Sequence, residues 1–320
     1  MTNIEPIIAT IPAELAGKRL DQALAALFPD YSRSRLKQWI LAGQVLVDGN
    51  TRRPRDAVTE GEVLRVSPIL KQEVSHHPEP IPLEILHEDE HILVLNKQAG
   101  QVVHPAAGHH SGTLLNALLH HAPVLENIPR AGIVHRLDKD TSGLMVVAKS
   151  LSAQKHLVEQ MQARDITREY LAITVAVMTA GGTVDAPIGR HPRQRKQMAV
   201  TEKGKHAISH YRVIERFGAH SLIRVKLETG RTHQIRVHMA HINYPLLGDP
   251  VYAGRLRIPP GSSEDFANIL RGFRRQALHA TRLLLVHPES NEEISWEVPV
   301  PEDMAHLLEA LREDLRARDQ

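Results

Sequence analysis

The 320-residue sequence contains no cysteine, which excludes disulfide bonds, a thiolate nucleophile, iron–sulfur clusters and cysteine-ligated zinc. Aromatic residues make up only 3% of the chain, which disfavours a nucleic-acid-binding sheet of base-stacking rings. No apolar run approaches the roughly 18 residues of a membrane span, and the first residues lack the features of a signal peptide. We therefore expect a cytoplasmic protein with no membrane partner.

Charge of either sign is not in large excess. The formal net charge is +2, so the overall charge favours an anionic partner only weakly. Evidence for an anionic partner must therefore come from local clusters of basic residues. Hydrophobic residues make up 42% of the chain, enough for one full core and a second, smaller domain.

Residues 13–67 read as a small αα-β unit. Leu20, Ala23, Leu24 and Leu27 share one helical face, and Ser32 is a candidate N-cap for a second helix. Two β-rich runs follow around turn signals at 48–49 and 60–61.

Basic residues gather in this unit, and they predict either an RNA-binding edge or a solvated helix face. The RNA-binding candidates are Arg33, Arg35, Lys37 and Arg52. Residues 68–82 are proline-rich without an apolar period, which is typical of a linker. Residues 83–320 then form the larger domain.

Short apolar runs dominate the larger domain and predict strands, for example HILVLNK, GLMVVAK, REYLAITVAV and SLIRVKLET. Helices are expected at TLLNALLHH, SAQKHLVEQMQ, THQIRVHMAH and 301–318. The irregular alternation argues against repeated βαβ units and for class α+β, with a mixed or largely antiparallel central sheet.

The segment GIVHRLDKDTSGLMVVAK places Asp138 and Asp140 in a polar turn between two apolar runs. A carboxylate flanked by Arg136 and Lys139 stays ionised and available as a nucleophile or base, although such aspartates often only cap turns. The segment also matches the first half of a calcium loop, but Lys149 stands where that loop requires glutamate. We therefore do not expect calcium.

The segment LETGRTHQIRVHMAH brings Arg231, His233 and Arg236 together at a helix start, with Thr232 as the candidate N-cap. Such a start can bind a phosphate, or its basic residues can simply face solvent. The chain has 21 histidines, yet no HExxH pattern occurs, so no metal is predicted. Tyr170, in the apolar run REYLAI, reads on its own as a core residue.

Taken together and in this order, HRLDKDTSGL, REYLAI and ETGRTHQIRVH resemble the three diagnostic motifs of the RluA-type pseudouridine synthases. The N-terminal unit resembles an S4 RNA-binding domain, so the resemblance covers nearly the whole chain. One departure is Gln98 in LNKQAG, where relatives usually have proline. The resemblance implies that Asp138 is the catalytic aspartate, Tyr170 the active-site tyrosine, Arg236 the basic partner of Asp138, and Arg136 the base-displacing arginine.

The implied reaction isomerises uridine to pseudouridine without a cofactor. The strings GTLLNALLHHAP and GDPVYAGR are most similar to a group that modifies several uridines in the helix 69 loop of 23S rRNA. We therefore expect large-subunit ribosomal RNA or its assembly precursor as partner, and a monomer. Three alternatives remain: another rRNA or tRNA site, a noncatalytic RNA-binding ribosome assembly factor, or a metal hydrolase that uses the histidines.

Overall fold

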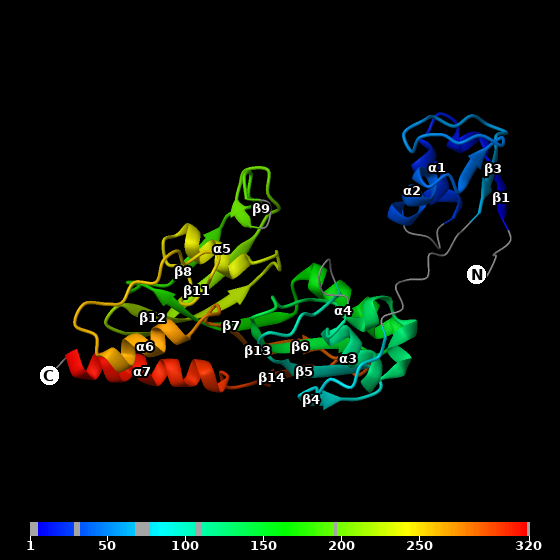
Figure 1. The fold of residues 1–320 in the computed structure, drawn as a ribbon. Helices are drawn as coiled ribbons and strands as arrows, with labels where there is room; N and C mark the ends of the chain where they lie inside the picture. Colours follow the sequence, from blue (N-terminus) through cyan, green and yellow to red (C-terminus); the bar gives the residue numbers. More distant parts are fainter. Residues whose placement is uncertain (1–5, 29–32, 68–76, 106–110, 195–196, 319–320) are drawn as a thin grey trace. The chain divides into compact units, whose positions relative to one another are not determined.

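Two compact units make up the chain, residues 1–75 and 76–320, and each has its own hydrophobic core. The structure is a computed structural model, and it describes residues 6–28, 33–67, 77–105, 111–194 and 197–318 (Figure 1). Most of residues 68–82, the expected linker, lie outside these ranges. Within the described residues, no helix combines the length and the apolar character that crossing a membrane requires.

The smaller unit contains two helices and one antiparallel sheet with strand order β1-β3-β2. Its elements are β1 (Ile7–Thr10), a 3-10 turn (Ala13–Leu15), α1 (Leu20–Leu27), α2 (Arg33–Leu41), β2 (Val45–Val47) and β3 (Val63–Val66). Leu20, Ala23 and Leu24 of α1 are buried, as the helical spacing predicts. Asp48 and Gly49 both have positive φ, so the expected tight turn follows β2. Strand β1 precedes the predicted unit and was missed, and Ser32 lies outside the described residues.

The larger unit is built on a nine-stranded sheet with the order β4-β5-β6-β13-β7-β12-β11-β8, and β14 also pairs with β13. Its strands are β4 (Ile85–Glu88), β5 (Ile92–Lys97), β6 (Ser142–Ala148), β7 (Thr167–Val175), β8 (Gly182–Asp185), β11 (Ile208–Arg216), β12 (His220–Leu227), β13 (Leu278–Val286) and β14 (Glu293–Glu297). All neighbours are antiparallel except β6 and β13. The α+β class and the mixed, largely antiparallel sheet are therefore confirmed.

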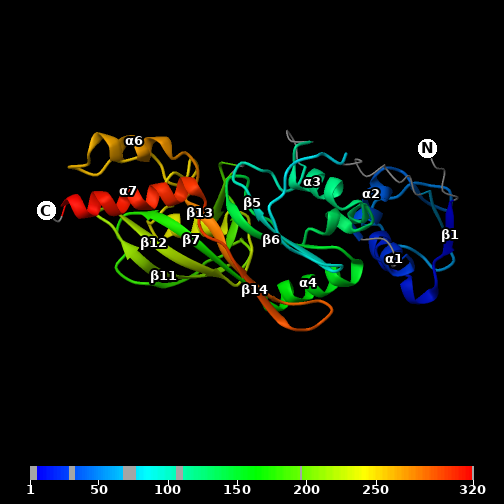
Figure 2. The same ribbon diagram turned by 90° about the horizontal axis from the view of Figure 1, so that it is seen from below.

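Helices cover both faces of this sheet (Figures 1 and 2). They are α3 (Leu114–His121), α4 (Leu151–Ala163), α5 (Gln234–His241), α6 (Glu264–Gly272) and α7 (Glu302–Arg318). Strand β7 shows why both faces must be covered: Tyr170 and Ala172 belong to one core cluster with α5, whereas Ile173 packs with α6 and α7. Burial on both sides suits an apolar run rather than strict alternation of polar and apolar residues.

The parallel contact between β6 and β13 is short. It pairs only Ser142 with His279 and Gly143 with Ala280, whereas β7 and β12 pair from Glu169 to Val175. Gly143 has φ +116°, and a Cβ there would collide with the carbonyl oxygen of Ala280. The glycine of the DKDTSG segment is therefore required for the close approach of the two strands.

Several smaller elements were not predicted from the sequence: β4, β8, the hairpin of β9 (Ile188–Arg190) and β10 (Met198–Val200), and α6. The strands β8 to β10 are only three or four residues long, too short for a periodic pattern to stand out. Two 3-10 turns, Pro123–Asn127 and Pro129–Gly132, lead from α3 toward the segment that carries Asp138.

Candidate active site

Asp138 lies in a tight turn directly before β6, where the sequence placed it. The Thr141 N–H donates to the Asp138 carbonyl at 3.1 Å and closes the turn. The fully buried Lys97 donates to the carbonyls of Gln98, Gln101 and Lys139 at 2.8 to 3.0 Å. Lys97 therefore ties the end of β5 to the turn that carries Asp138.

Burial lowers the pKa of Lys97 to about 7, although the nearby carboxylates of Asp140 and Asp138 oppose that shift. Lys97 was not singled out from the sequence, and the signal was a charged residue that ends an apolar run. The departure at Gln98 leaves this arrangement in place, because its carbonyl accepts from Lys97 and its side chain donates to Glu84 at 2.7 Å.

A buried arginine joins two carboxylates. Arg236 of α5 donates through Nη1 to Asp138 Oδ2 at 3.0 Å. On its other edge it forms a bidentate pair with Asp249, with distances of 2.7 Å and 2.9 Å. Asp249 is fully buried, and it also accepts the backbone N–H groups of Val251 and Tyr252. Asp249 therefore fixes Arg236, and Arg236 in turn fixes Asp138.

Burial alone would lower the pKa of Arg236, but hydrogen bonds and charge from Asp249 and Asp138 outweigh it and raise the pKa. Arg236 is therefore a permanent cation beside Asp138. Asp249 was missed in the sequence because it stands 13 positions after Arg236, and only the tertiary fold brings the two together. Its one sequence signal was the string GDPVYAGR.

The start of α5 differs from the prediction. The N-cap is His233, in the left-handed conformation at φ 57°, and not Thr232. The physical reason is Gln234, whose side-chain oxygen accepts the Arg231 N–H at 2.9 Å and the Thr229 hydroxyl at 2.8 Å. Gln234 thereby orders the turn before the helix, and the His233 carbonyl accepts the first helical hydrogen bond, from the Val237 N–H at 2.9 Å.

His233 is brought to the edge of the site by this backbone turn. Its Nε2 lies 3.9 Å from Asp138 Oδ2, and its Nδ1 contacts the Tyr252 hydroxyl at 2.8 Å. The Tyr252 ring in turn lies under the Arg236 guanidinium, 5.1 Å from its centre. Tyr252 thus supports both basic residues, a role that the sequence alone did not indicate.

Tyr170 is 6% exposed and projects from β7 toward the same space. Burial and the charge of Asp138 raise its pKa, against an opposing effect of Arg168, so it stays a neutral phenol. Tyr170 is therefore both a core residue, as its apolar run suggests, and a wall of the site.

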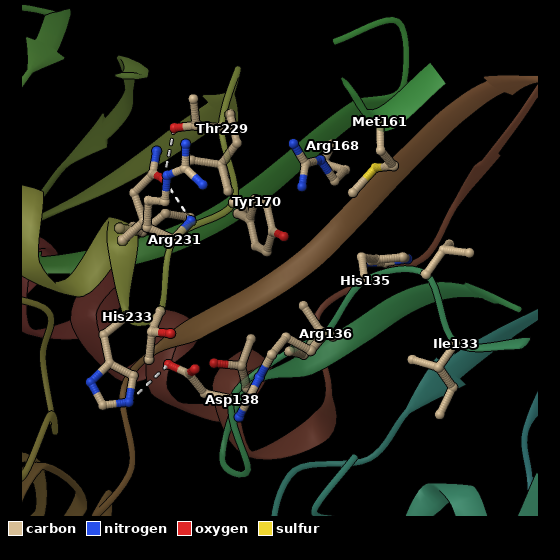
Figure 3. A pocket seen from close by; sticks show the side chains of 18 of the residues that line it. Ile133, His135, Arg136, Asp138, Met161, Arg168, Tyr170, Thr229, Arg231 and His233 are labelled. Carbon is tan, nitrogen blue, oxygen red and sulfur yellow. Dashed lines mark hydrogen bonds and ion pairs between the residues drawn. The ribbon is translucent and has the colours of Figure 1, made fainter. Parts of the chain in front are cut away.

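A cavity of about 800 Å³ opens between these residues. Asp138, Tyr170, Arg231, His233 and Arg236 all line it. In Figure 3, Asp138 faces His233 at one end, while Tyr170 lies between Asp138 and Arg168. Arg136 is exposed beside Asp138 and also lines the cavity. The fold thus assembles three distant sequence segments around one space.

Two of the basic residues predicted to bind RNA in the smaller unit form ion pairs with carboxylates of that unit. Arg33 pairs with the buried Asp21 at 3.0 Å, and Arg52 pairs with Glu62 at 2.6 Å. Lys37 is exposed on α2, and the side chain of Arg35 lies outside the described part of the chain. Two of the four charges are therefore partly balanced within the unit.

His238 of α5 has structural partners. His238 is fully buried, and its ring nitrogens contact the Ser209 hydroxyl and the Ala186 carbonyl, both at 2.9 Å. In the described ranges, no three histidine, aspartate or glutamate side chains form a metal-sized group. His109 and His110 lie outside those ranges. Hydrogen bonding thus accounts for His238 without a metal.

Comparison with known proteins matches each unit to a family of its own. Residues 91–241 match the RNA pseudouridylate synthase family and residues 18–64 match the S4 domain. A protein from Pseudomonas aeruginosa, ribosomal large subunit pseudouridine synthase D, is 60% identical over 309 residues, 97% of each chain. The protein of that name from Escherichia coli is 56% identical and covers 96% of this chain and 95% of its own.

A solved structure is also similar. Human RNA Pseudouridylate Synthase Domain Containing 4 is 28% identical, with a TM-score of 0.57, and the match covers 72% of this chain and 93% of the human one.

Proposed function

Because the chain belongs to the RNA pseudouridylate synthase family, we propose that it isomerises uridines to pseudouridine in large-subunit ribosomal RNA. The observation that supports this proposal is the position of the Asp138 carboxylate. It is bonded to the buried Arg236 and lines the same cavity as Tyr170. All residues that line the cavity lie in one unit of one chain. That arrangement supports a monomer as the active form.

The reaction breaks the N1–C1′ bond of uridine and forms a C5–C1′ bond. C5 loses a proton and N1 gains one, so atoms and electrons balance without a redox cofactor. Asp138 is the one carboxylate here that is both ion-paired to Arg236 and open to the cavity. We assign it the attack on the ribose or base, or the removal of the C2′ proton.

Tyr170 and Arg136 receive supporting roles. The neutral phenol of Tyr170 offers a flat surface on which the uracil stacks. Arg136 is exposed at the cavity, placed to fill the space that the flipped base leaves in its RNA stack. Arg231 and His233 lie at the same rim and meet the RNA backbone.

The proposed target site is the helix 69 loop of 23S rRNA, in which several uridines are modified in turn. The name of the two bacterial relatives supports the large subunit. One cavity can serve neighbouring uridines if the stem is recognised through its shape and phosphates. The low aromatic content of 3% agrees with recognition that does not stack a fixed string of bases.

Mapping pseudouridine at single-nucleotide resolution tests this assignment. We expect rRNA from a deletion strain to lose its helix 69 pseudouridines and a plasmid copy of the gene to restore them. If these positions keep their pseudouridines while another rRNA or tRNA site loses one, the proposed target site is wrong and the proposed reaction is still supported. If no site changes, the proposed function fails.

Removing residues 1–75 is expected to weaken binding of a helix 69 stem-loop at least 10-fold. The reason is that Arg33, Lys37 and Arg52 supply phosphate contacts, and each lost contact lowers the salt dependence of log K by about 0.7 to 0.9. Affinity is measured across a salt titration. Melting of the truncated chain is the folding control, because residues 76–320 contain their own core. An unchanged affinity and slope would show that the smaller unit does not bind this RNA.

A further inference from the structure

Arg168 is a buried cation, and within the part of the chain that the structure describes no carboxylate pairs with it. It is 7% exposed, and its Nε atom is buried without a hydrogen-bond partner. Among the described residues, no hydrogen bond or ion pair to its guanidinium is found. A buried, unpaired charge is costly, so a group of this kind calls for an explanation.

The neighbouring carboxylates are already engaged by other cations. Glu169 projects to the opposite face of β7 and pairs with Arg224 at 3.1 Å. Glu228 pairs with Arg164 at 2.6 Å and with His210 at 2.7 Å. Neither of these two carboxylates is therefore free to balance the charge of Arg168.

The guanidinium borders the cavity of the candidate active site. Arg168 and Tyr170 are alternate residues of β7, so both point to the same face, about 7 Å apart along the strand. Figure 3 shows Arg168 beyond Tyr170 as seen from Asp138. A Cβ at Gly230 would come within 2.8 Å of Arg168 Nη1, so the absent side chain of Gly230 gives the guanidinium its place.

The surroundings favour an anion. Arg130 and Arg231 line the same cavity, together with the Arg164–Glu228 ion pair. His135, next to Arg168, accepts the Val146 N–H through Nε2 at 3.1 Å. Burial and the charge of Arg168 lower the pKa of His135 to about 3, so this ring is neutral and does not compensate the arginine. A uracil carbonyl is also neutral and would leave the charge uncompensated, whereas a phosphodiester carries a full negative charge.

We propose that Arg168 binds a phosphodiester group of the substrate RNA, next to the target uridine, while the uracil lies against Tyr170. This site rests on the proposed function, because it takes the ligand to be an RNA strand. It makes Arg168 a positioning residue: the phosphate contact sets how far the strand enters, and thereby where the ribose meets Asp138.

A consequence is that the buried charge of Arg168 destabilises the folded protein when no RNA is bound. Replacing that charge with an apolar side chain of similar length removes the burial cost. We therefore expect Arg168→Met to raise the melting temperature of the free protein while it weakens RNA binding. A purely structural arginine predicts the reverse, a lower melting temperature with unchanged affinity.

The sharpest test substitutes a neutral methylphosphonate for one phosphate at a time in a helix 69 stem-loop. For the wild-type protein, we expect one linkage beside the target uridine to weaken binding by about 10- to 100-fold. For Arg168→Met, binding of the unmodified RNA should already be weaker by that factor, and the same methylphosphonate should have no further effect. The salt slope should also fall by about 0.7.

Arg316→Met is the matched control, because Arg316 is exposed on α7, which packs on the face of β7 opposite Tyr170. It should leave affinity, salt slope and methylphosphonate sensitivity unchanged. If Arg168→Met stays as sensitive to every methylphosphonate as the wild type, the proposal is overturned. Product formation is measured separately on the unmodified RNA. If Arg168→Met loses the methylphosphonate sensitivity but the wild type forms no pseudouridine, only the proposed function is refuted. If the wild type forms pseudouridine but Arg168→Met keeps the methylphosphonate sensitivity, only this site is refuted.

Discussion

Asp138→Asn is expected to lower pseudouridine formation by about 10⁴-fold or more while RNA affinity stays within a few-fold of wild type. The change keeps the size of the side chain and removes the charge that attacks or accepts a proton, and losses of this order are typical when such a group is removed. Single-turnover measurement with a radiolabelled stem-loop gives the rate, and a filter-binding titration gives the affinity.

Asp140→Asn provides the matched control. It removes the same charge from the same turn, but Asp140 does not line the cavity and its side chain does not contact Arg236. We expect it to retain most of the wild-type rate. Comparable rates for Asp138→Asn and the wild type would exclude Asp138 as the reacting carboxylate.

Asp249→Asn is expected to reduce both stability and turnover. One edge of Arg236 would face an amide that cannot accept both hydrogen bonds, which leaves a buried cation with only Asp138 as a charged partner. Breaking a buried pair in this way costs about 3 to 5 kcal/mol of unfolding free energy. With Arg236 less well placed, we expect kcat to fall about 10- to 100-fold and KM to change little. Urea unfolding and steady-state kinetics check the two effects.

Asp303→Asn is the comparison for stability. Asp303 also forms a bidentate pair with an arginine, Arg275, at 2.6 and 2.7 Å, but its side chain is 50% exposed. Solvent weakens such a pair, so the expected loss is about 1 kcal/mol or less. Equal losses for the two variants would show that burial does not set the importance of Asp249.

The sequence predicted the parts of the fold that depend on local patterns. The apolar runs of β5, β6, β7 and β12 were recognised, because strands buried on both faces are apolar throughout. Strand β1 was missed because four residues that pair with the distant β3 carry little local signal. Helix α6 was missed although Ser263 caps it in the usual way and Phe266, Ala267 and Leu270 form its buried face.

The same distinction holds for the site. Asp138, Tyr170 and Arg236 were proposed because each lies in a recognisable motif, and the structure places all three around one cavity. Asp249 and Lys97 act through contacts with residues far along the chain, Arg236 and Lys139. Arg168 points to a ligand because its buried guanidinium has no hydrogen-bond or ion-pair partner among the described residues. The sequence cannot show that such a partner is absent.

The short contact between β6 and β13 bears on how the site is held together. Asp138 stands just before β6, on one side of that seam, while Tyr170 and Arg236 belong to the other side, on β7 and after β12. With only two paired backbone positions, side chains carry much of the connection: Ser142 bonds His279 at 2.9 Å, and Gln276 donates to Thr141 at 3.0 Å. The Asp138–Arg236 ion pair spans the same seam. The position of the reacting carboxylate relative to Tyr170 is therefore set by side-chain contacts rather than by a long backbone ladder.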